Sequence, residues 1–111
     1  MLTDLKYLQQ MTGNDSDVMK EMIELFLHQL AEMRVDIEFL MTSENWTDLS
    51  RLAHKIKSSS HVMGVLQMAD EMKELELLTR EGKDIERYPD IVARLNTMID
   101  VIEVELGPYL K

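Results

Sequence analysis

Histidine and basic residues gather in one stretch of the chain that contains no acid. Residues 49–69 hold neither Asp nor Glu, although the 111 residues include twenty-one acids against twelve Lys or Arg. The stretch carries His54, His61, Arg51, Lys55 and Lys57, so its formal charge is +3 while the rest of the chain carries −12. A neutral imidazole nitrogen is a nucleophile, and neighbouring cations stabilise anionic oxygens. The spacing therefore indicates chemistry on an anionic electrophile.

Helical geometry predicts that His54 faces solvent. At 100° per residue, Leu52, Ile56 and Met63 lie between about 160° and 200° from His54, which sets the core direction. Five residues lie within about 60° of His54 by the same rotation: Ser50, Arg51, Lys57, Ser58 and His61. The alternative is that this stretch is only the neutral face of one helix in an acidic protein.

A metal site is the competing interpretation of these histidines, and the spacing disfavours it. His54 and His61 are two helical turns apart, or about 10.5 Å along the axis. One ion bound by both rings needs each nitrogen about 2 Å away. The Glu-x-x-His pattern of di-iron helical bundles is absent from the sequence. His28 lies opposite an apolar stripe, so we expect an ordinary surface histidine there.

The elements that would position His54 are amphipathic helices. Four long segments repeat apolar residues at steps of three and four, and a short apolar segment precedes them. The long helices are expected from about residue 16 to 41, 46 to 63, 66 to 80 and 88 to 106. Short loops make sequential helices antiparallel. The sequence therefore predicts an all-α fold, an up-down-up-down antiparallel four-helix bundle with a short N-terminal helix, as a single domain over residues 1–111.

Composition excludes several classes of function. A net charge of −9 disfavours binding to nucleic acid or to anionic membranes. The absence of Cys excludes disulfides, zinc–thiolate sites and cysteine nucleophiles. The sequence has no apolar run of membrane-spanning length, and its first residues do not resemble a signal peptide. We therefore expect a cytoplasmic location.

The run from Leu52 to Gly64 resembles the core motif of histidine-containing phosphotransfer (HPt) domains. That motif has a His, a Lys three residues later, small residues after it, and a Gly ten residues after the His, as at His54, Lys57 and Gly64. The resemblance implies that His54 is a phosphoacceptor and that Lys57 stabilises the charge of the phosphoryl group. Ser58 departs mildly from the Gly that is usual in the family, and a small residue there leaves room for a partner.

The resemblance also implies roles outside the motif. Family members often place a polar residue on the following helix to hold the inner ring nitrogen, and Glu76 stands at the corresponding position; the alternative is an ordinary solvated glutamate. Receiver domains dock near the histidine, partly on an apolar patch formed by the leading helix. The expected partner-binding residues are Arg51, Lys55, Ser58, His61, Leu5 and Leu8.

The function that follows from the resemblance is that of a phosphorelay intermediate. It would accept a phosphoryl group on His54 from a receiver aspartyl-phosphate and pass it to another receiver. We expect a monomeric phosphocarrier and not an enzyme, with no ATP site and no cofactor of its own; the receiver would supply Mg²⁺. The expected partners are response-regulator receiver domains and a hybrid sensor histidine kinase. The alternatives are the phosphoacceptor domain of a chemotaxis-type kinase and a non-catalytic helical adaptor.

Overall fold

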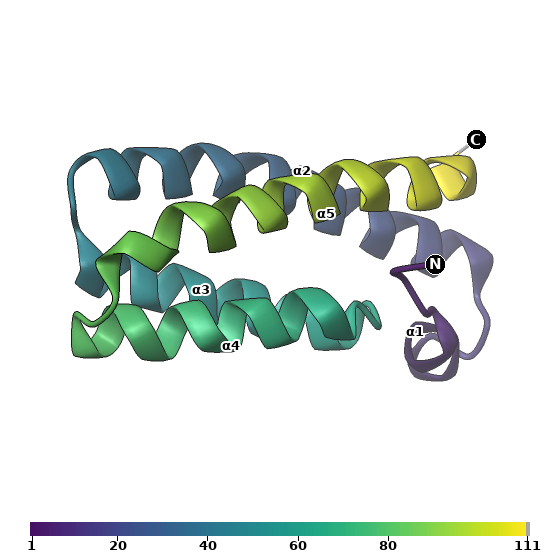
Figure 1. The fold of residues 1–111 in the computed structure, drawn as a ribbon. Helices are drawn as coiled ribbons and strands as arrows, with labels where there is room; N and C mark the ends of the chain where they lie inside the picture. The colour runs from purple at the N-terminus through teal and green to yellow at the C-terminus, as the bar shows by residue number, and fades with distance from the viewer. Residues whose placement is uncertain (111) are drawn as a thin grey trace.

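The computed structural model describes residues 1–110, and these form helices joined by short loops, with no strand among them (Figure 1). Seven elements follow in order: α1 Lys6–Met11, α2 Ser16–Thr42, α3 Trp46–Val62, α4 Leu66–Glu81, the 3₁₀ turn η1 Ile85–Arg87, α5 Tyr88–Leu106 and the 3₁₀ turn η2 Gly107–Leu110. The predicted all-α class is confirmed. The helix α3 ends one residue before the predicted Met63, and α4 ends one residue after the predicted Arg80.

Side chains that cap the helix ends account for these boundaries. The Asp15 carboxylate accepts hydrogen bonds from the first amides of α2, and the Asn45 side chain accepts one from the Asp48 amide of α3. Pro89 lies in the first turn of α5, where its missing N–H costs nothing. Gly82 ends α4 in the left-handed conformation. No helix among residues 1–110 has the length and hydropathy needed to cross a membrane.

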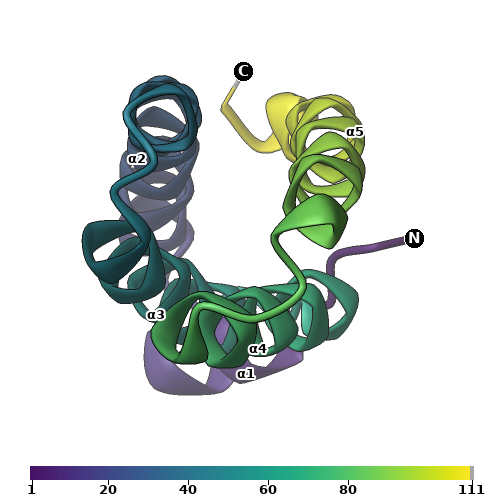
Figure 2. The same cartoon turned by 60° about the vertical axis from the view of Figure 1, so that its left-hand side comes forward.

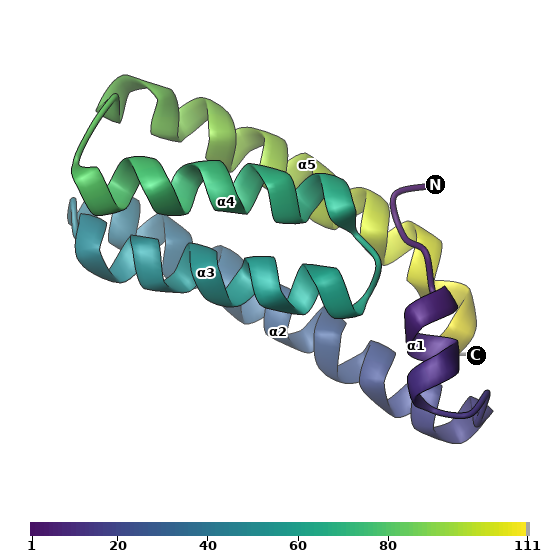
Figure 3. The same ribbon diagram turned by 90° about the horizontal axis from the view of Figure 1, so that it is seen from below.

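The four long helices lie around one elongated core. Figure 2, a view towards the end of the molecule, shows α2, α3, α4 and α5 around a common interior. The helices α3 and α4 lie side by side along their whole length and make the most extensive contact between any two elements (Figure 3). The molecule measures 43 × 21 × 21 Å. Residues on α3 can therefore meet residues on α4 over several turns.

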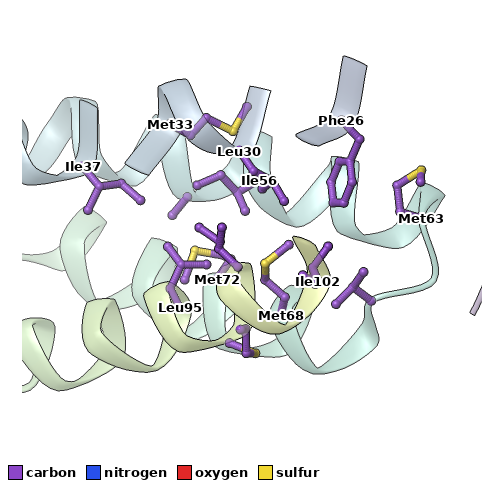
Figure 4. Packing of buried hydrophobic residues seen from close by; sticks show 14 of the residues in the cluster. Phe26, Leu30, Met33, Ile37, Ile56, Met63, Met68, Met72, Leu95 and Ile102 are labelled. Carbon is purple, nitrogen blue, oxygen red and sulfur yellow. The ribbon is translucent and has the colours of Figure 1, made fainter. Parts of the chain in front are cut away.

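Apolar side chains from all four long helices fill this interior (Figure 4). The helix α2 supplies Phe26, Leu30, Met33 and Ile37, which face Ile56 of α3, Met68 and Met72 of α4, and Leu95 and Ile102 of α5. Unbranched methionines adapt to irregular gaps, which suits their place at the centre of the core. The residues of α3 that point into the core determine which face of this helix is exposed to solvent.

The leading segment is part of this core, which corrects one prediction from the sequence. Leu5 is 8% exposed and Leu8 is fully buried, so neither belongs to an exposed apolar patch. Only Leu8 lies within α1, because that helix begins at Lys6. The helix crosses the end of the molecule where α3 turns into α4 (Figure 3), and its apolar side covers the core there. Leu2 is partly buried against the same cluster.

A carboxylate on α5 binds the start of the chain. Glu105 Oε2 accepts a hydrogen bond from the Leu2 amide at 2.9 Å. Its Oε1 accepts from the amide and the hydroxyl of Thr3, at 2.9 and 2.7 Å. Desolvation raises the pKa of Glu105, but these hydrogen bonds and the nearby terminal ammonium group outweigh it, so the pKa lies below its usual value. The first residues and the end of α5 are thereby held together.

We expect acid or loss of the Glu105 charge to loosen this attachment. A carboxyl group whose pKa is lowered on folding contributes stability above its unfolded-state pKa and loses it as the pH falls through the folded-state value. Glu105→Gln should lower the free energy of unfolding by about 1 kcal/mol at neutral pH, because charge-assisted hydrogen bonds become neutral ones. The difference should disappear at a pH below the folded-state pKa of Glu105. Urea unfolding of both proteins across pH measures it, and a pH-independent difference would contradict it.

Candidate functional site

His54 lies near the middle of α3 on the side away from the core. Its side chain is 60% exposed. The opposite side of the same helix buries Leu49, Ala53 and Ile56. The predicted orientation of His54 therefore agrees with its position in the structure.

A carboxylate from α4 contacts the inner nitrogen of this ring. Glu76 Oε2 is 3.0 Å and Oε1 is 3.2 Å from His54 Nδ1. Lys57, one turn after His54 on α3, donates from Nζ to Glu76 Oε1 at 2.9 Å. The Glu76 side chain is only 13% exposed and that of Lys57 is 23% exposed. The structure thus brings together three residues that the sequence predicted as one site, and Glu76 is not an ordinary solvated glutamate.

The electrostatics of Glu76 determine the hydrogen bonding of the ring. Desolvation raises the pKa of Glu76, but hydrogen bonds and charge from Lys57 and His54 outweigh it, so the pKa lies below its usual value. At neutral pH the group is a carboxylate and can only accept hydrogen bonds. The tautomer assigned by this contact has the proton on Nδ1 of His54, which leaves the Nε2 lone pair free. An exposed nitrogen of this kind can attack an electrophile that approaches from solvent.

The other predicted polar residues surround His54 on the exposed face of α3. Ser58 donates from Oγ to the His54 carbonyl oxygen at 3.2 Å, and Lys55 and His61 are exposed. Arg51 is also exposed, but its Nη1 lies 3.3 Å from Asp48 Oδ1. Two of the three cations in the acid-free stretch therefore have an acidic partner in space, Arg51 with Asp48 and Lys57 with Glu76. The positive charge of this face is weaker than the sequence alone indicates.

The position of Ser50 differs from the one predicted from the sequence, on the exposed face beside His54. The rotation along the helix placed it on the exposed face, but its relative exposure is only 9%. Its Oγ donates across to the main-chain carbonyl oxygen of Glu76 at 3.0 Å. The prediction used a single core direction for α3, whereas α4 covers a second side of that helix. No sequence pattern marks this serine, because its partner is a main-chain atom.

An apolar groove lies between α2 and α3, on the part of α3 that follows His54. It has a volume of about 140 Å³. Its lining residues are Met22, Leu25, Phe26 and Gln29 from α2 and Ser59, Val62 and Met63 from α3. Leu25 is 58% exposed at its edge. The exposed apolar surface beside the α3 face therefore comes from α2, and not from Leu5 and Leu8.

His28 lies on α2, outside the site around His54. His28 is exposed on α2, where its Nε2 lies 3.0 Å from Glu32 Oε1 one turn away. Across the described part of the chain, no group of three His, Cys, Asp or Glu side chains is arranged to hold a metal ion. Neither feature adds a residue to the site around His54.

Comparison with known proteins identifies the family. A model of the Hpt domain matches residues 21–105, which include the whole of α3 and α4. The chain belongs to the Hpt domain family. Hpt domains are phosphocarrier modules of two-component phosphorelays and not ATP-binding kinases, and they interact there with receiver domains and kinases.

A solved structure supports the Hpt fold. The chain is similar to histidine-containing phosphotransfer protein B (HptB) of Pseudomonas aeruginosa PAO1, with a TM-score of 0.88 and 20% sequence identity. The match covers 96% of this Hpt domain and 91% of that chain. No curated protein sequence matches significantly. At this identity the likeness concerns the fold, so the roles of individual residues depend on the geometry described above.

Proposed function

We propose that this Hpt domain is a phosphorelay intermediate that accepts a phosphoryl group on His54 from a receiver aspartyl-phosphate and passes it to a second receiver. The observation that carries the proposal is the contact of His54 Nδ1 with the Glu76 carboxylate, which leaves Nε2 as the free nitrogen on an exposed face. Family membership supports histidine phosphotransfer. Within residues 1–110, His54 is the only one of the three histidines whose ring contacts a carboxylate that also binds a lysine.

The transfer step balances without any further reactant. The Nε2 lone pair of His54 forms a bond to phosphorus while the bond from phosphorus to the receiver's aspartate oxygen breaks, and the aspartate leaves as a carboxylate. The ring keeps its proton on Nδ1 and becomes cationic, and the Glu76 carboxylate stabilises that charge. Lys57 offsets the charge of the phosphoryl oxygens. The receiver supplies Mg²⁺ and the acidic pocket, and the second transfer is the reverse step on another receiver.

The surface around His54 suits a receiver domain. Lys55, Ser58, His61 and Arg51 present small, polar or basic side chains on the exposed face of α3. The apolar groove between α2 and α3, with Leu25 at its edge, adds contact area from which water can be removed at little cost in free energy. The polar and partly basic face would orient the acidic pocket of a receiver, and the apolar surface beside it would add affinity. We propose that the domain is monomeric, because such a face must stay open to successive partners.

The proposed architecture is the one expected from the sequence. We infer a single domain in which α2, α3, α4 and α5 form an up-down-up-down antiparallel bundle, with α1 across one end. The short connections between α2 and α3 and between α3 and α4 support it, because a loop of three residues leaves no room for a crossover. The cytoplasmic location expected from the sequence stays a prediction.

The experiment that tests the proposed function is transfer of labelled phosphate from a receiver. Receiver domains of the source organism are phosphorylated with a radiolabelled acyl phosphate in Mg²⁺, purified from the donor, and mixed with this protein. We expect label on the protein that is labile in acid and stable in base, and its passage to a second receiver. Label obtained only from an ATP-bound kinase would favour the chemotaxis-type alternative. Binding of receivers without any label would favour the adaptor and overturn the proposal.

A further inference from the structure

Glu76 is hydrogen-bonded to α3 through both its main chain and its side chain. The carboxylate contacts His54 Nδ1 and Lys57 Nζ, at 3.0 and 2.9 Å. The main-chain carbonyl oxygen accepts a hydrogen bond from Ser50 Oγ at 3.0 Å. Ser50 precedes His54 by four residues, which is one helical turn. One helix therefore fixes both ends of the residue that contacts the imidazole.

The direction of the Ser50 hydrogen bond distinguishes it from those of Ser58 and Ser60 on the same helix. Ser58 donates to the carbonyl oxygen of His54, and Ser60 donates to that of Ile56, each four residues earlier in the same helix. A buried serine in a helix can be satisfied in this local way. Ser50 instead donates across to α4, and among the residues of α4 its acceptor is Glu76. The requirement that a buried hydroxyl be paired does not explain this choice of partner.

The contact restrains the position in which the carboxylate is held. Hydrogen bonds such as the one at His54 Nδ1 weaken steeply when the angle at the hydrogen falls below about 120°. A shift of α4 along or around its axis would move the Glu76 carboxylate relative to the ring. The Ser50 hydrogen bond resists that shift at Glu76 itself. Its main chain is thus tied to α3 one turn before the histidine that its side chain contacts.

We infer that Ser50 is a positioning residue for His54: by holding the main chain of Glu76, it keeps the carboxylate on Nδ1 and the Nε2 nitrogen unprotonated. The inference deepens the proposed function and rests on it for the consequence in phosphotransfer. Its structural part, the effect of Ser50 on the ring tautomer, does not depend on phosphotransfer. Neither Ser50 nor its hydroxyl touches the ring, so its action passes through Glu76.

The test compares Ser50→Ala with Ser60→Ala. Both variants remove one buried hydroxyl from α3, but only the first removes a contact with Glu76. Nitrogen-15 NMR of the His54 ring reports the tautomer directly. We expect Ser50→Ala to reduce the population protonated on Nδ1 and to slow phosphoryl acceptance about 5-fold, as the loss of one such hydrogen bond implies. Ser60→Ala should leave the tautomer and the rate unchanged, whatever its effect on thermal stability. Ser50→Cys, a nearly isosteric and weak donor, should change both in the same direction as alanine.

A double-mutant cycle with Glu76→Ala decides whether Ser50 acts through Glu76. Without the carboxylate, adding Ser50→Ala should have no further effect on the tautomer or on the rate. Additive effects, or an unchanged tautomer in folded Ser50→Ala, would overturn the inference. If wild type accepts no phosphoryl group while Ser50→Ala still shifts the tautomer, the proposed function fails and the positioning role stands. If wild type transfers normally while the tautomer is unaffected, the positioning role alone fails.

Discussion

Replacing His54 with glutamine is expected to abolish phosphoryl acceptance from a phosphorylated receiver. Glutamine keeps a polar side chain on α3 and can still meet Glu76, but its amide nitrogen has no lone pair available for attack on phosphorus. The neighbours Lys57 and Ser58 cannot readily replace it, since Lys57 is hydrogen-bonded to Glu76 and Ser58 to a main-chain oxygen. Acid-labile, base-stable label should fall by at least about 100-fold, to the background of the assay.

The matched control for this variant is His28→Gln. His28 is exposed on α2 and pairs with Glu32, so the same chemical change is made at a histidine outside the site. This control should accept label at the rate of wild type. Circular dichroism should show equal helix content in both variants, because each substitution is at an exposed position. Label that persists in His54→Gln and disappears in His61→Gln would show that the wrong histidine has been assigned.

The helices could be predicted from the sequence because their signals are local. Asp15 and Asn45 act as the N-terminal caps that their residue types suggest, and Pro89 stands in the first turn of α5. The period of apolar residues then gives the face of each helix that is buried. The orientation of His54 follows from this period alone. The pairing of His54 with Glu76 was implied by the resemblance to a family, because no local rule joins residues twenty-two positions apart.

The errors arise where a helix is covered on more than one side. A single core direction describes a helix with one neighbour, but α3 packs on the core and along the full length of α4 (Figure 3). Ser50 lies on the side facing α4 and is buried although it is polar. Leu5 and Leu8 were expected at the surface because the resemblance to the family implied an apolar docking patch on the leading segment. Its position across the end of the core depends on tertiary contacts that the sequence does not encode locally.

The charge of the site also differs from what the composition suggests. The acid-free stretch is continuous in sequence, yet Glu76 enters it from α4 and Asp48 borders it on α3. The Glu76 carboxylate offsets Lys57 in the absence of a phosphoryl group. In the proposed transfer, the oxygens of the phosphoryl group would compete for the Lys57 ammonium while the cationic ring would retain Glu76. The same three residues would then balance charge before and after that step.

The largest expected effect on stability comes from Gly64, the last residue of the motif, which lies in the turn between α3 and α4. The structure gives two reasons for glycine at this position. Its φ is +66°, and a Cβ atom there would lie 1.8 Å from the carbonyl oxygen of Asp4. The main chain of the leading segment thus packs directly on this residue. Gly64→Ala must both adopt a strained conformation and displace Asp4, and we expect a loss of about 3 kcal/mol in the free energy of unfolding.

Gly82→Ala separates the two causes, because Gly82 has nearly the same φ, +64°. Apart from its chain neighbours, no atom of residues 1–110 lies within 4 Å of the position of a Cβ there. It should lose only about 1 kcal/mol, the cost of the left-handed conformation for alanine. The difference between the variants, measured by urea unfolding, is the contribution of the contact with Asp4. In Gly64→Ala the amide NMR signals of α1 should shift and those of Leu2 and Thr3 should exchange faster with solvent, because displacing Asp4 pulls on the segment that Glu105 holds. Equal losses in the two variants, with α1 unperturbed, would show that the leading segment does not depend on Gly64.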